Sequence, residues 1–191
     1  QHRQSLCCLC VALSLLAWLC RCWILEPFAG RAYFLSCGVF SKEEAKQLRI
    51  DFWTAFGVYM RQHDSLLGPR QKWVNYHTGV KDIFFRLEVD ARVARVSITM
   101  EHHDPGMRAL FYAQFEEMRN YLALETGIDW IWEPIFVNAE GKEIARIYCE
   151  QSGVSLYNKP GWGPMLAFLA ARIVALDRVW NDIAHNERIL H

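Results

Sequence analysis

The segment Lys81–Asp104 places acidic residues and histidines where two strand-like runs meet the start of a helix. If residues 91–92 form a two-residue turn, the runs pair antiparallel and Asp82 lies opposite Glu101, with His103 nearby. Two neighbouring carboxylates can hold a hard cation such as Mg²⁺, and a basic group beside them can assist hydrolysis of a phosphodiester. The same grouping is also typical of the solvated end of a hairpin, where nearby cations relieve the two negative charges.

The grouping departs from the usual nuclease pattern of an aspartate combined with a Glu-x-Lys pair. His103 stands where that pattern has lysine, and imidazole carries little charge at neutral pH. Lys81 adjoins Asp82, but strand alternation directs it to the other face. We therefore interpret the hairpin end as structural and predict no metal or other cofactor. The alternative is a Mg²⁺-dependent nuclease or phosphodiesterase with Asp82 and Glu101 as metal ligands and His103 as a catalytic residue.

The connector "KWVNYHTGVKD" before the first strand gathers aromatic and polar side chains. Its tryptophan and tyrosine can stack on a base or pack on a peptide, while its amide and hydroxyl groups supply hydrogen bonds. The same aromatic side chains can instead cover the end of the core. Together with the polar face of the first hairpin, the connector supplies the predicted binding residues, which are Lys72, Trp73, Asn75, Tyr76, Thr78, Lys81, Arg86 and Glu88.

The alternation of side chains in the first hairpin predicts one apolar and one polar face. With the turn at 91–92, Phe85 faces Ile98 on the apolar side, and Glu88 faces Arg95 on the polar side. This pattern indicates an antiparallel sheet that is covered on one side only. A second hairpin is predicted in residues 129–150.

Three helices are predicted around these hairpins. The first begins at Ser41, which can form a capping box with Glu44. The second runs from a cap at Asp104 to Gly127, and the third starts near Pro164. The order helix, hairpin, helix, hairpin, helix predicts an α+β domain with one four-stranded, mainly antiparallel sheet and helices packed on its apolar face. Residues 39–191 form this single domain.

Residues 1–38 differ from the rest of the chain. Six of the seven cysteines lie in this segment, and an uncharged run from Ser5 to Cys20 follows Arg3. This bias ends abruptly near Gly38, which favours a stretch translated from upstream sequence, outside the folded domain. The alternative is a signal peptide or a membrane anchor within residues 5–25, although a helix over the uncharged run is short for a bilayer.

The composition of the whole chain restricts its function. Lys plus Arg and Asp plus Glu each number 21, so the formal net charge is zero. A neutral chain has no general electrostatic attraction for nucleic acid or for an anionic membrane. The near-absence of cysteine after Cys37 suits a reducing compartment. We expect a cytoplasmic protein, with a membrane-anchored or exported one as the alternative if residues 1–38 are native.

From Val39 to Asp182 the sequence resembles an uncharacterised bacterial family known as domain of unknown function 4268. The stretches that carry the resemblance are "SKEEAKQLRIDFWTAFG", "VNYHTGVKDIFFRLEVD", "MRALFYAQFEEMR", "DWIWEP", "GKEIARIY" and "ALDRVWND". The resemblance implies no activity. The sequence as a whole predicts a non-catalytic binding module for a protein or a nucleic-acid complex, and the phosphodiesterase remains the alternative.

Overall fold

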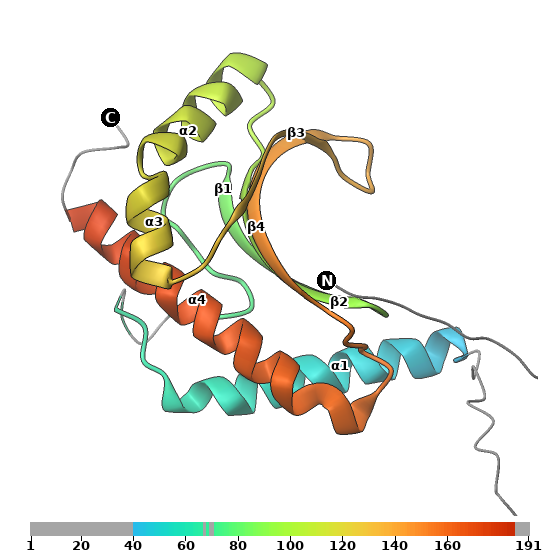
Figure 1. Cartoon of the computed structure of the whole chain (residues 1–191). Helices are drawn as coiled ribbons and strands as arrows, with labels where there is room; N and C mark the ends of the chain where they lie inside the picture. Colours follow the sequence, from blue (N-terminus) through green and yellow to red (C-terminus); the bar gives the residue numbers. More distant parts are fainter. Residues whose placement is uncertain (1–39, 67, 69–70, 186–191) are drawn as a thin grey trace, which may run out of the picture. The chain divides into compact units, whose positions relative to one another are not determined.

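The computed structural model describes residues 40–66, 68 and 71–185, which lie within one compact unit, Val39–His191. The predictions for residues 1–38, an anchor included, fall outside these described residues. Figure 1 shows helices packed against a single curved sheet. The elements are α1 (Lys42–Tyr59), β1 (Ile83–Val89), β2 (Val93–Met100), α2 (Pro105–Glu117), α3 (Arg119–Thr126), β3 (Ile131–Val137), β4 (Glu143–Ser152) and α4 (Trp162–His185), with short 3-10 turns at Met60–Gln62 and Lys159–Gly161.

The sheet is four-stranded with the order β1-β2-β4-β3, and all of its neighbouring strands are antiparallel. The register of the first hairpin is the predicted one, since Ile83 pairs with Met100 and Val89 with Ala94. The turn between β1 and β2 is closed by Asp90, whose carboxylate accepts hydrogen bonds from the backbone N–H groups of Arg92 and Val93. The α+β class and the single antiparallel sheet are thus as predicted.

The first helix starts as the sequence indicates. The hydroxyl of Ser41 accepts a hydrogen bond from the backbone N–H of Glu44, and the Glu44 carboxylate accepts one from the N–H of Ser41. This reciprocal pair satisfies two donors that a helix start leaves free. Phe52 and Phe56 then lie one turn apart and are both fully buried. The capping box thus marks the start of α1, and the spacing of Phe52 and Phe56 determines the side that faces the core.

The helix predicted between the two hairpins is two helices. The backbone at Met118 leaves the helical conformation, with φ −94° and ψ 5°, so α2 ends at Glu117 and α3 begins at Arg119. The predicted stop at Gly127 is confirmed, and its φ of 63° is one that glycine adopts without strain. The predicted order with one helix at this position is therefore wrong in detail, because a break occurs where neither glycine nor proline stands.

Strand β3 is an edge strand and pairs only with β4 among the described strands. Its register shifts between Glu133 and Phe136, on either side of Pro134. Proline has no backbone N–H, so an irregular edge is where a strand tolerates it. Pro134 therefore stands both on an edge strand and at an irregularity of its register.

The core lies between the apolar face of the sheet and the helices, which cover its convex side in Figure 1. Helix α4 supplies a continuous buried stripe, and Trp180 of α4 packs edge-on against Phe85 of β1 and parallel to Phe115 of α2. None of the helices in the described ranges has the combination of length and apolarity that a membrane crossing requires. Fully buried residues of the core are Phe52, Phe56, Ala94, Val96, Ile98, Met100, Ala145, Ile147, Met165, Leu169 and Ile173.

Candidate functional site

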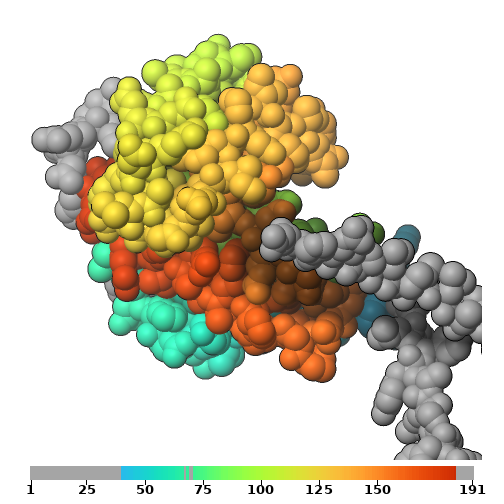
Figure 2. All heavy atoms as spheres, in the orientation of Figure 1, coloured from blue at the N-terminus to red at the C-terminus, as the bar shows by residue number. Residues whose placement is uncertain are grey.

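The face of the sheet that turns away from the helices is polar and concave. Alternation along the paired strands brings side chains of all four strands to it in register. Figure 2 shows the surface hollowed beneath the β3–β4 hairpin. We call this surface the concave face, and define it by Arg86, Glu88, Arg95, Ser97, Thr99, Glu133, Phe136, Ile144, Arg146, Tyr148 and Glu150.

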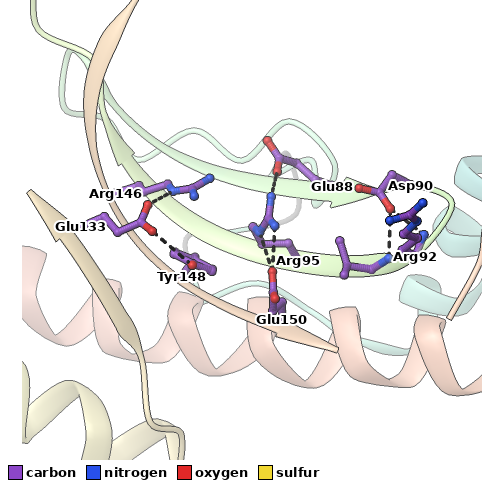
Figure 3. A network of polar contacts seen from close by, with 9 residues as sticks. Glu88, Asp90, Arg92, Arg95, Glu133, Arg146, Tyr148 and Glu150 are labelled. Carbon is purple, nitrogen blue, oxygen red and sulfur yellow. Dashed lines mark hydrogen bonds and ion pairs between the residues drawn. The ribbon is translucent and has the colours of Figure 1, made fainter. Parts of the chain in front are cut away.

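Arg95 stands at the centre of a row of charges across three strands (Figure 3). Its guanidinium donates to Glu88 of β1 at 3.2 Å and to Glu150 of β4 at 2.7 Å. Burial of Arg95 opposes its charged form, but the bonds to the two carboxylates prevail and raise its pKa. A partly buried arginine that donates hydrogen bonds to two carboxylates is held in one orientation.

Arg146 of β4 is the most enclosed cation of the concave face, with a side chain 11% exposed. Its Nε donates to Glu133 of β3, and the hydroxyl of Tyr148 donates to the same carboxylate at 3.3 Å. The guanidinium carbon lies 3.3 Å from the ring centre of Phe136 and 4.5 Å from that of Tyr148. Stacking and hydrogen bonding together fix the plane of this guanidinium.

A cavity of about 350 Å³ occupies the part of the concave face nearest the β3–β4 hairpin. Ser97 and Thr99 form its floor, Arg86 and Arg146 flank them from the neighbouring strands, and Phe136 contributes an apolar wall. Cavities of this size that combine an apolar wall with a few fixed polar groups are typical of binding sites. The other residues that line this cavity are Glu88, Glu101, Asn138, Ala139, Glu140 and Ile144.

The carboxylates of Asp82 and Glu101, predicted to oppose each other, have separate partners. The backbone N–H of Glu101 donates to the carbonyl of Asp82 at 2.8 Å, so the two residues are neighbours in the main chain. However, Asp82 has a φ of 64°, outside the range of strands, and its carboxylate lies 3.8 Å from Nε2 of His102. Glu101 is instead bonded to Arg86 at 3.0 Å and lies 3.8 Å from Nζ of Lys142.

Histidine 103 does not complete a site with these carboxylates. Its ring stacks on that of His102, with 4.5 Å between centres. Among the described residues, no group of three or more histidine, cysteine, aspartate or glutamate side chains is placed to hold a metal ion. The charge of Glu101 is balanced by Arg86 of β1 and by Lys142 of the turn between β3 and β4.

Two of the predicted binding residues in the connector are part of the core. The hydroxyl of Tyr76 donates a hydrogen bond to the Asp177 carboxylate of α4 at 2.6 Å. Burial raises the pKa of Tyr76 far above its usual value, and the hydrogen bond to Asp177 raises it further. The hydroxyl of Thr78 donates to the carbonyl of Ile83 at 2.7 Å. The indole N–H of Trp180 donates to the carbonyl of Thr78 at 2.7 Å. These contacts fasten the connector to α4 and β1.

The remaining connector residues lie elsewhere. Lys72, Trp73 and Asn75 line a second pocket, of about 480 Å³, beside the end of α1, and Lys81 is exposed. Arg86 and Glu88 are the two predicted residues that belong to the concave face. The structure thus divides the predicted set between a core contact, a pocket at α1 and the sheet.

Sequence reasoning missed the residues of the second hairpin that build the concave face. Glu133, Arg146 and Tyr148 alternate with the apolar residues of their strands, and this alternation would have placed them beside Arg95 once the strand order was known. It also missed Asp177, although an acidic residue in phase with the buried stripe of a helix is a recognisable signal.

Comparison with known proteins identifies a family for this chain. A family model described as a domain of unknown function, DUF4268, matches residues 48–184. No curated protein and no solved structure matches the chain. The family match spans α1 to α4, and therefore includes every strand of the concave face. Since the match covers most of the 191 residues, the chain belongs to the DUF4268 family.

Proposed function

We propose that this protein is a binding module without catalysis of its own, and that its concave face receives a segment of a partner protein. The observation that carries the proposal is the cavity over Ser97 and Thr99. Its polar walls are held in fixed positions, since Arg146 is bonded to Glu133 and stacked on Phe136 before any ligand is present. Such preorganisation lowers the entropic cost of binding.

The balance of charge on the concave face favours a protein partner over a nucleic acid. Arg86, Arg95 and Arg146 are each bonded to a glutamate, so the face alternates in sign. A protein surface that binds nucleic acid needs an excess of lysine and arginine, because these side chains displace counterions from the phosphates. Mixed charge with arginine and aromatic side chains is typical of protein interfaces.

Site-specific photocrosslinking tests this surface. Benzoylphenylalanine is introduced at Glu88 or Glu140, which line the cavity, and at Lys46 on the exposed side of α1 as the control. After irradiation of the cells that make the protein, we expect both cavity positions to link the same protein and the α1 position not to link it. The attached polypeptide is identified by mass spectrometry.

The identified partner is then produced in pure form and its affinity is measured by calorimetry. Ser97→Leu extends an apolar side chain into the cavity and should weaken binding at least tenfold, while Ser152→Leu, on the exposed end of β4, should not. Unchanged affinity in the Ser97 variant, or cavity positions that link only nucleic acid, would contradict the proposal.

A further inference from the structure

Ser97 is a buried polar residue whose side chain makes no hydrogen bond to the described part of the protein. It is 2% exposed, lies on the floor of the cavity, and its hydroxyl has no hydrogen-bond partner within the described part of the chain. Its neighbour on the floor differs, since the hydroxyl of Thr99 lies 3.1 Å from the Glu101 carboxylate. The fully enclosed side-chain atoms without a partner in the described residues are Gln114 Oε1, Gln151 Oε1 and Arg172 Nε, so the Ser97 hydroxyl is not sealed in the protein but is open to the cavity.

Arg146 also has unused hydrogen-bonding groups at this place. Only its Nε is bonded, to Glu133, and its two terminal nitrogens have no partner among the described residues. Arg146 lines the cavity, and its β2 neighbour in the register is Thr99, two residues from Ser97. The stack on Phe136 fixes the guanidinium plane, so the free edge keeps one direction.

The acceptors around the cavity are, in contrast, largely in use. Glu101 is bonded to Arg86 and Thr99, and Glu88 accepts from Arg95. The carboxylate of Glu140, exposed at the hairpin, is the one in the cavity wall without a partner in the described ranges. The cavity therefore has unused donors in the terminal nitrogens of Arg146 and in the Ser97 hydroxyl, and a ligand group with paired acceptors matches them.

We propose that this cavity binds a single carboxylate group of the partner protein, bonded to Arg146 and to the hydroxyl of Ser97. The inference rests on the proposed function and names the chemistry that the concave face recognises. A carboxylate matches the paired N–H groups at the edge of a guanidinium. A phosphate dianion suits this cavity less, because Glu88, Glu101 and Glu140 already line it.

Small probes that differ in one group test the inference with the intact chain. N-acetyl-glutamate N-methylamide presents a side-chain carboxylate, and the glutamine analogue presents an amide of the same shape. N-acetyl-glycine presents a chain-terminal carboxylate, and inorganic phosphate presents the dianion. Each is titrated against the ¹⁵N-labelled protein, and the chemical shifts of the Ser97 amide and the Arg146 Nε–H are followed.

We expect at least one carboxylate probe to saturate these signals, with the amide probe at least tenfold weaker. The tighter of the two carboxylates tells whether a side chain or a chain end is preferred. Ser97→Ala should weaken the carboxylate probe about tenfold, the usual effect of losing a hydrogen bond to a charged group. Ser152→Ala, the matched change on the exposed end of β4, should leave the affinity unchanged.

A measurement of folding separates binding from structure. Because the Ser97 hydroxyl has no partner in the protein, Ser97→Ala should have an unfolding midpoint equal to or above that of the parent. Equal binding of carboxylate and amide probes, tighter binding of phosphate, or no response at Ser97 would overturn the inference. If these results arise while Ser97→Leu still blocks the crosslinked partner, the carboxylate assignment alone fails and the binding function stands.

Discussion

Asp177 is the residue on which the position of the connector depends most. It is 1% exposed, and its carboxylate accepts hydrogen bonds from the hydroxyls of Ser65 and Tyr76 and from the backbone N–H of Leu66. A buried carboxylate persists only when donors surround it in this manner. One side chain of α4 thus organises two stretches of chain more than a hundred positions earlier.

The substitution Asp177→Asn should destabilise the protein by about 3 kcal/mol, because the amide NH₂ would face one of the three donors and leave it unbonded. The free energy of unfolding is measured by urea titration. Asp182 offers a matched control on the same helix, since it also accepts from a tyrosine hydroxyl, that of Tyr121, but on the surface. Asp182→Asn should change the free energy by less than about 0.5 kcal/mol. Equal effects would show that burial of Asp177 is unimportant.

The predictability of single residues depended on whether local rules applied to them. The pairing of Glu88 with Arg95 followed from strand alternation, because the first hairpin is regular. Asp82 did not follow, because its positive φ interrupts the alternation one residue before β1, and aspartate at such a φ gives no signal distinct from a strand residue. The predicted carboxylate pair was therefore correct in main-chain register and wrong in side-chain direction.

At the scale of elements, β3 is the exposed part of the sheet. Ile135 is 70% exposed on this edge strand, and Ile131 and Val137 are also exposed. An apolar edge strand is a template for pairing with another chain. Pro134 interrupts it, since the register shifts there and one backbone donor is missing.

Pro134→Val should promote self-association through β3, because it restores a donor and favours a regular strand. Analytical ultracentrifugation over a range of concentrations should show dimers or larger species that the parent lacks at the same concentration. Pro105→Ala, at the first position of α2, removes a proline outside the sheet and should not associate. A monomeric Pro134 variant at all concentrations would show that the edge is protected by other means.

The elements themselves were predictable where a cap or a turn marks them. The capping residues Ser41 and Asp104 indicated the starts of two helices, and the turn after Asp90 indicated the register of the first hairpin. The break between α2 and α3 was not predictable, because Met118 is a good helix former and neither glycine nor proline marks the position. The site needed the order β1-β2-β4-β3, which brings Arg146 beside Thr99, and no local pattern specifies that order.

Over the whole molecule, α4 connects the sheet, the connector and α2. The single residue Trp180 contacts the rings of Phe85 and Phe115, and its indole N–H donates a hydrogen bond to the carbonyl of Thr78. Contacts shared in this way couple the parts, so that loss of one removes support from the others.

We therefore expect residues 40–185 to unfold in a single transition. Far-ultraviolet circular dichroism, which follows the helices, and tryptophan fluorescence should give the same urea midpoint. Trp180→Phe keeps the aromatic packing and loses the bond to Thr78, and should lower both midpoints together. Two separate midpoints in the parent would mean that the connector or α1 is an independent folding unit.

The contact of Asp177 with Ser65, Leu66 and Tyr76 also has an evolutionary consequence. Replacement of Asp177 first would leave the buried hydroxyl of Tyr76 without its acceptor. Replacement of Tyr76 first would leave the buried carboxylate of Asp177 without one of its donors. Neither intermediate is well tolerated, so positions 76 and 177 are expected to change together within the family or to stay as they are. The residues of the concave face lie outside this contact, so the constraint does not apply to them.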